Sequence, residues 1–266
     1  MSILSKFTSL MLGATLLLSG CKGKDGEPGP AGPAGPVGPS LSGSLIGFIT
    51  AFSEDGDNLS KAGITVTITS VTPQISQTTD ANGRFEFPNL KTGTYNLAFS
   101  RTGLGTNRVF GFAHLGGDQP TVMPMYLTYV TAVSQTMVSG LSASGPQFSS
   151  SIGYYTNLSA SLNNNSVRVP YRAIVLYASA SSNVSASTGA LLGSYYAYQN
   201  SGSPSSFEVL RSRFVSAGFA TGSTVYLIAY GVPEYYNLSY VDPATGRTVY
   251  PGMNPTPSQV VTTVVP

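Results

Sequence analysis

Glycine occupies every third position of a segment near the start of this chain. Six triplets run from Gly23 to Gly38, and proline follows most of the glycines. Proline fixes φ near the polyproline II value and has no backbone N–H, so this segment suits neither a helix interior nor a central strand. We expect an extended rod of about 3.1 Å per residue, which would separate its two ends by about 50 Å.

The same spacing is that of a collagen-like repeat. Three polyproline II chains can wind together only where glycine fills the crowded axis at every third step. Two interpretations stay open for residues 21–42: a homotrimer joined through this repeat, or a stalk in which each chain is a stiff spacer.

A secretory signal precedes the stalk. Residues 1–20 contain Lys6 and the apolar stretch Leu10–Leu18, too short to span a bilayer as a mature helix. The residues Leu18-Ser19-Gly20-Cys21 resemble the lipobox of bacterial lipoproteins, whose cysteine is acylated and becomes the new N-terminus. The resemblance implies lipidation of Cys21 and the membrane as a partner; an ordinary cleaved signal is the alternative.

The resemblance also implies a location. Lys22 follows the cysteine, where lipoproteins retained at the inner membrane usually carry aspartate. We expect a bacterial envelope protein, lipid-anchored at the outer membrane, with surface exposure left open.

Composition indicates an all-β fold and excludes one class of partner. Charged residues make up only 9 %, and Gly, Ser, Thr, Asn and Tyr are abundant, which suits short strands joined by turns. Once Lys6 leaves with the signal, 13 basic residues become 12, against 11 acidic ones. No basic run remains to follow phosphates, so we expect no nucleic-acid partner. The single cysteine allows no intrachain disulfide.

Residues 43–128 have the pattern of a first β domain. In residues 62–69, Ile64, Val66 and Ile68 alternate with threonines, which predicts one buried face. Asn82-Gly83 predicts a tight hairpin turn followed by an inward-facing pair, Phe85 and Phe87. Further predicted strands cover residues 45–52 and 94–99, the second with Tyr95, Leu97 and Phe99 on one face.

The run TTDANGRFEFPNLKTGTYNLAFSRTG (residues 78–103), with AGITVTI (62–68) upstream, resembles the carboxypeptidase regulatory-like domain. That family has a transthyretin-like antiparallel β-sandwich, which the resemblance implies here. It also implies a non-catalytic accessory module; related starch-binding modules share the general fold.

Residues 129–266 predict a second antiparallel sandwich. The segment Phe219–Gly231 resembles the approach to the sixth strand of fibronectin type III domains, which implies an Ig/fibronectin-III-like fold. Residues 207–215 are predicted as one or two helical turns, because Phe207, Leu210 and Phe214 recur at helical spacing. The predicted strands cover residues 151–155, 167–178, 191–198, 224–231 and 260–265, and those within 172–178 and 224–230 are expected to be central.

Few residues in the sequence could serve in catalysis or metal binding. The loop Glu54–Asn58 carries oxygen ligands that suit calcium, but a solvated turn is the better interpretation. His114 is the sole histidine, predicted in a loop or at a strand end, and it lacks the ligands of a zinc site. The carboxylates are scattered, Asp118, Glu208 and Glu234 among them, and suggest no acid–base pair. We expect no metal, no cofactor and no enzyme activity.

Tyrosines are the best candidate ligand contacts. Adjacent tyrosines place one ring on each face of a strand, so one ring of each pair should meet solvent or a partner. The candidate contacts are Tyr195, Tyr196, Tyr235, Tyr236 and Tyr240. Partial burial driven by β propensity is the alternative explanation.

The order of anchor, stalk and β modules favours a surface-anchored, non-catalytic lipoprotein for adhesion or scaffolding. Carbohydrate binding in a polysaccharide-capture system is the alternative, and the sequence identifies neither a protein nor a glycan partner.

Overall fold

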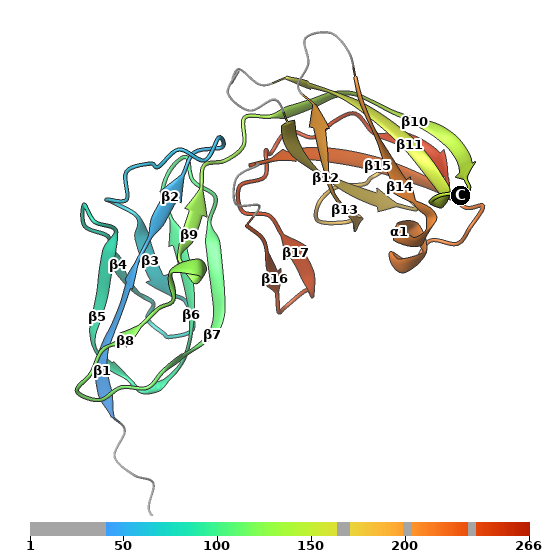
Figure 1. The fold of residues 1–266 in the computed structure, drawn as a ribbon. Helices are drawn as coiled ribbons and strands as arrows, with labels where there is room; N and C mark the ends of the chain where they lie inside the picture. The colour runs from blue at the N-terminus through green and yellow to red at the C-terminus, as the bar shows by residue number, and fades with distance from the viewer. Residues whose placement is uncertain (1–40, 164–170, 199–203, 234–237) are drawn as a thin grey trace, which may run out of the picture. The chain divides into compact units, whose positions relative to one another are not determined.

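The computed structural model describes residues 41–163, 171–198, 204–233 and 238–266. The predicted signal, Cys21, almost all of the stalk, Tyr235, Tyr236 and Glu234 lie outside these ranges. Residues 40–266 form one compact unit. Its described part is all-β, as predicted (Figure 1).

The first group of strands includes those that the alternating pattern predicted, with the expected run at residues 45–52 divided into two strands. It consists of β1 (Ser42–Phe48), β2 (Thr50–Phe52), β3 (Thr65–Ile68), β4 (Ile75–Thr78), β5 (Arg84–Lys91), β6 (Gly93–Ser100), β7 (Asn107–His114), β8 (Thr121–Val122) and β9 (Tyr129–Thr131), with the 3-10 turn η1 (Met125–Leu127) before β9. The strands form sheets with the orders β5-β1-β8, β4-β3-β6-β7 and β2-β9.

The core of this sandwich uses the predicted residues. Ile64, Val66 and Ile68 are fully buried, and Phe85 and Phe87 are nearly so. They share one apolar cluster, to which Tyr95, Leu97 and Phe99 also belong. The period-two prediction is confirmed because these side chains face the interior between the sheets.

Two details of pairing differ from the prediction. Gly83 has φ of 80°, but the turn at Asn82-Gly83 joins strands of different sheets: β4 pairs with β3, and β5 with β1. The hairpin prediction is therefore wrong. Gly83 is needed because a Cβ there would lie 2.3 Å from the carbonyl oxygen of Ile49. The sandwich is also not wholly antiparallel, since β1 pairs with β8 and β2 with β9 in parallel.

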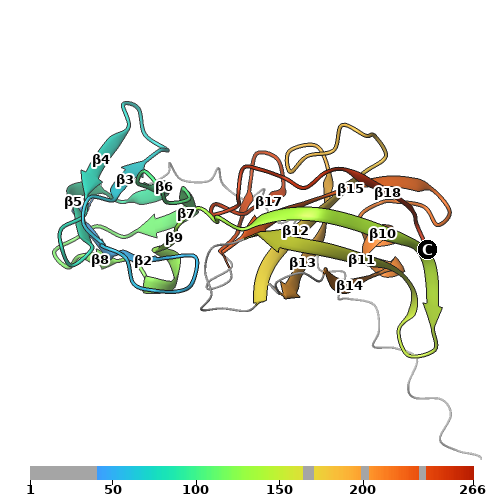
Figure 2. The ribbon, with the colours of Figure 1, turned by 90° about the horizontal axis from the view of Figure 1, so that it is seen from above.

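The second group of strands forms two main sheets and a ribbon (Figure 2). Its elements are β10 (Met137–Ser149), β11 (Gly153–Asn163), β12 (Tyr171–Ser179), β13 (Ala190–Tyr198), β14 (Ser205–Leu210), α1 (Arg211–Ser216), β15 (Thr224–Val232), β16 (Tyr240–Asp242), β17 (Arg247–Val249) and β18 (Val261–Val264). The sheet orders are β10-β11-β14 and β13-β12-β15-β18, and β16 pairs with β17.

The two most apolar strands, β12 and β15, are the central strands of the four-stranded sheet, as predicted. One face of this sheet joins residues of β10, β11 and β14 in a common core. The predicted helical turns begin only at Arg211: Phe207 belongs to β14, and Phe214 anchors α1 in the core. Phe207 in β14 and Phe214 in α1 both pack into that core. Their spacing in the sequence therefore resembled that of a single helix, although they belong to two elements.

The other face of the four-stranded sheet carries a second apolar cluster. Loop residues such as Val184 and Met253 pack against it, and the Arg247 guanidinium donates hydrogen bonds to the carbonyl oxygens of Ala186 and Gly189. Tyr177 lies in this cluster, where burial raises its pKa to about 12. Part of this face is thus covered by loops.

The acidic loop after β2 has a role that the sequence did not reveal. Glu54 is buried, so the prediction of a solvated turn is wrong for this residue. Its Oε1 accepts hydrogen bonds from the Ser134 hydroxyl (2.5 Å), the Thr136 hydroxyl (2.5 Å) and the Thr136 N–H (3.3 Å). Its Oε2 accepts one from the Gln135 N–H at 2.9 Å. The carboxylate therefore fixes the segment between β9 and β10.

The neighbouring residue adds an ion pair. Asp55 accepts a hydrogen bond from the guanidinium of Arg172 at 2.5 Å. Arg172 lies near the start of β12 and is fully buried. A buried guanidinium needs such a partner, because leaving water without one costs several kcal/mol. The loop Glu54-Asp55 thus holds two segments that are distant in sequence.

We predict that Glu54→Gln lowers the free energy of unfolding by about 2 kcal/mol. The amide would direct N–H donors at the backbone N–H of Gln135, and the charge-assisted hydrogen bonds would weaken. Urea denaturation measures the effect. Asp118→Asn is the control, because Asp118 is exposed; an equal loss in both variants would contradict the role of Glu54.

Candidate functional site

Three tyrosines gather at one end of the outer face of the four-stranded sheet. Tyr196 and Tyr198 alternate along β13, and Tyr171 on β12 stands opposite Tyr198. Their exposed fractions are 58 % (Tyr196), 41 % (Tyr198) and 52 % (Tyr171). We call these three residues the tyrosine face. Of the three, only Tyr196 was predicted from the sequence as a ligand contact.

Backbone pairing of β12 with β13, a ring contact and the Ser205 side chain hold the tyrosine face in place. The rings of Tyr171 and Tyr198 meet edge to face with centroids 5.1 Å apart. The Ser205 hydroxyl accepts a hydrogen bond from the Tyr198 N–H and donates one to the Tyr198 carbonyl, which ties the end of β13 to the start of β14. Rings placed on paired strands lose little freedom when they bind a partner.

Tyr195 belongs to the interior side of the same strand. Its ring stacks on Phe207, with centroids 5.0 Å apart and planes at 29°. The hydroxyl oxygen is buried and has no hydrogen-bond partner among the described residues. Burial raises the pKa of Tyr195. The pair Tyr195-Tyr196 thus places one ring on each face, as expected of adjacent strand residues.

Tyr240 lies apart from the tyrosine face, on β16. Its ring centroid is 5.8 Å from that of Phe110, on β7. The two rings line a cavity of about 310 Å³ together with Tyr126 and Arg108. Burial raises the pKa of Tyr240, and the charge of Arg108 opposes this shift.

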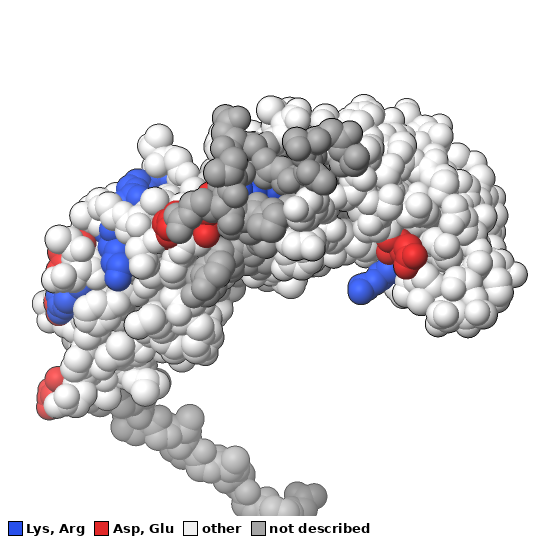
Figure 3. Space-filling view, turned by 45° about the horizontal axis from the view of Figure 1, so that its top comes forward, with Lys and Arg blue, Asp and Glu red and all other residues white. Residues whose placement is uncertain are grey.

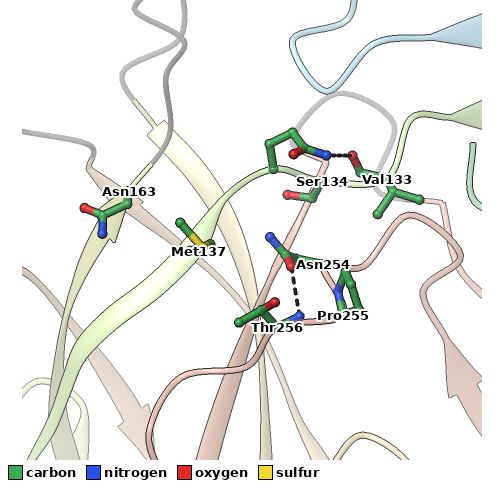
Figure 4. Close-up of a pocket in the computed structure, with 8 residues that line it drawn as sticks. Val133, Ser134, Met137, Asn163, Asn254, Pro255 and Thr256 are labelled. Carbon is green, nitrogen blue, oxygen red and sulfur yellow. Dashed lines mark hydrogen bonds between the residues drawn. The ribbon is translucent and has the colours of Figure 1, made fainter. Parts of the chain in front are cut away.

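A larger pocket of about 400 Å³ lies beside the start of β10 (Figure 4). Sequence reasoning missed it, because its walls come from three separate stretches of chain. The lining residues are Val133, Ser134, Gln135, Met137, Asn163, Asn254, Pro255 and Thr256.

The remaining candidates for chemistry do not assemble. His114 ends β7, as predicted; it is buried, and its Nε2 lies 3.0 Å from the Leu90 carbonyl oxygen. Asp118 and Glu208 are exposed and lie on different sandwiches. The described residues include no cluster of three or more metal-ligating side chains.

Charge is sparse on the surface that Figure 3 shows, where acidic and basic residues appear as small, separate groups. In the part of the chain that the structure covers, no helix is long and apolar enough to cross a membrane.

Comparison with known proteins identifies the first sandwich. Residues 44–127 match the carboxypeptidase regulatory-like domain. The resemblance inferred from residues 62–103 is therefore confirmed. The fibronectin-like resemblance of residues 219–231 stays weak. No curated protein matches the chain.

Several solved structures match the chain at low similarity. A candidate carbohydrate-binding protein from Bacteroides uniformis is 13 % identical with a TM-score of 0.32, over 82 % of this chain and 97 % of that one. A DUF3823 family protein from Parabacteroides merdae is 14 % identical with a TM-score of 0.26, over 85 % and 100 %. The major pilin SpaD from Corynebacterium diphtheriae is 13 % identical with a TM-score of 0.26, over 84 % and 67 %. At these values the similarity carries no information on what this chain binds.

We predict that Tyr195→Phe leaves the free energy of unfolding unchanged or raises it by up to about 1 kcal/mol. The substitution removes a buried hydroxyl without a partner and keeps the stacked ring. Tyr195→Ala should lower the same quantity by about 2 kcal/mol or more, because the ring packs against the core. Urea denaturation of both variants checks this; a clear loss in Tyr195→Phe would show that the hydroxyl is engaged.

Proposed function

We propose that this chain is a lipid-anchored, non-catalytic protein of the bacterial envelope that binds a neutral glycan through the tyrosine face. The observation that carries the proposal is the grouping of Tyr171, Tyr196 and Tyr198, each at least 41 % exposed, on adjacent paired strands.

Exposed rings on a fixed sheet suit the apolar faces of sugars. A pyranose ring presents C–H groups with partial positive charge, and an aromatic ring presents a negative π face. The tyrosine hydroxyls can exchange hydrogen bonds with sugar hydroxyls at the rim of the contact. Tyrosine also presents a large contact area with few rotatable bonds, so ordering it costs little entropy.

The charges of the chain favour a neutral ligand. Arg172, next to Tyr171, is buried and paired with Asp55, so it is not presented to a ligand. An acidic polysaccharide would find no counter-charge within the tyrosine face.

Adhesion or scaffolding through a protein partner is the second candidate. It is favoured by the tip of the β10–β11 hairpin, where Phe148 and Tyr154 are exposed and their ring centroids lie 4.9 Å apart. Arg211 lies 4.5 Å from the centre of the Tyr154 ring. Aromatic and arginine side chains are enriched at protein–protein contacts.

We predict that residues 41–266 are retained by at least one neutral polysaccharide in affinity gel electrophoresis. Tyr196→Ala and Tyr171→Ala should each weaken binding about tenfold or more, because each removes an aromatic contact typical of a binding hot spot. A panel of neutral and acidic polysaccharides tests both the binding and the preference.

Tyr126→Ala is the matched control. Tyr126 is also an exposed tyrosine, at 69 %, but it lies in η1 of the first sandwich. A loss in Tyr126→Ala with none in Tyr196→Ala would move the site to the cavity near Tyr240. No retention on any polysaccharide would discard the glycan proposal and favour a protein partner.

The anchor is a separate part of the proposal, supported by the residues around Cys21. We predict that mass spectrometry of the mature protein finds fatty acyl groups on an N-terminal Cys21, and that Cys21→Ser abolishes both acylation and membrane retention. A mature N-terminus with a free thiol would refute the anchor without affecting the glycan test.

A further inference from the structure

The pocket beside β10 combines a fixed floor with free polar groups at its rim. Asn254 is buried; its amide donates a hydrogen bond to the Thr136 carbonyl and accepts one from the Thr256 N–H, both at 2.9 Å. The Ser134 hydroxyl, also buried, is held by Glu54 at 2.5 Å. These bonds fix the floor before any ligand arrives.

The rim offers hydrogen-bonding groups that the protein leaves unused. Asn163, at the end of β11, is exposed and makes no side-chain hydrogen bond among the described residues. Gln135 donates through Nε2 to the Val133 carbonyl (3.3 Å), and its Oε1 has no donor there. The Thr256 hydroxyl is also without a partner in the described part of the chain. A ligand can therefore gain hydrogen bonds without breaking existing ones.

An apolar surface completes the pocket. Met137 is 45 % exposed, and in the view of Figure 4 it is drawn between Asn163 on one side and Ser134 and Asn254 on the other. Pro255 adds a second apolar group. The polar groups can hydrogen-bond the hydroxyls of a ligand, and the methionine and proline side chains can contact its C–H faces.

Size and charge narrow the class of ligand. A volume of about 400 Å³ is near the lower end of small-molecule pockets, about 300–1,000 Å³. None of the described lining residues is charged. An ionic ligand would give up hydration without an opposite charge among these described residues in return, which is unfavourable.

We propose that this pocket is a second binding site, which takes a single neutral sugar residue. Amide groups of Asn163 and Gln135 would hydrogen-bond its hydroxyls, and Met137 would contact its C–H face. The ligand class rests on the proposed function, but the site shares no residue with the tyrosine face.

The methyl group of Met137 reports directly on this pocket. Residues 41–266 with ¹³C-methyl-labelled methionine are titrated with millimolar glucose, galactose, N-acetylglucosamine and glucuronate, and the signal missing from Met137→Leu is assigned to Met137. We expect its shift to move with at least one neutral sugar and not with glucuronate. Asn163→Ala should reduce the apparent affinity about fivefold or more, whereas Tyr196→Ala should leave it unchanged.

The outcomes separate this site from the tyrosine face. No movement of the Met137 signal with any neutral sugar overturns the pocket proposal, even if polysaccharides are retained through Tyr196. Equal movement with glucuronate, or no effect of Asn163→Ala, also overturns it. A saturable, Asn163-dependent shift supports the pocket even if the tyrosine face retains no polysaccharide.

Discussion

The buried carboxylate of Glu54 is the constraint on which the described structure most depends. A charge that leaves water must find donors, and Glu54 finds them in three successive residues that follow β9. Asp55 then pairs with the buried Arg172, at the strand that also carries Tyr171. The segment fixed by Glu54 forms part of the pocket, and the strand held by Asp55 presents part of the tyrosine face.

Local periodicity predicted the buried strand faces of the first sandwich well, because a strand with one buried face has apolar side chains at alternate positions. Ile64, Val66 and Ile68 show this. Strand pairing was less predictable: Asn82-Gly83 has hairpin chemistry, but its flanking strands join different sheets. The role of Glu54 could not be predicted, because its partners lie about 80 residues away in the sequence. No local pattern distinguishes a buried acidic residue from a solvated one.

The candidate site was predictable only in part. Adjacent tyrosines had to face opposite ways, and Tyr195 and Tyr196 do. Tyr198 shares the face of Tyr196 by simple alternation, a signal available in the sequence. Tyr171 joins them only through the register of β12 against β13, which no single-strand pattern encodes. The pocket beside β10 was beyond prediction for the same reason.

The parallel pairing of β2 with β9 has a mechanical consequence. Thr50 stands opposite Tyr129 and Phe52 opposite Thr131, and the two strands run in the same direction. A pull on the chain before β2 and after β9 would drag these strands past each other lengthwise. Their hydrogen bonds would then be loaded together rather than opened one by one from an end. Under tension applied in this direction, the arrangement favours slow rupture, a property governed by the unfolding rate rather than by equilibrium stability.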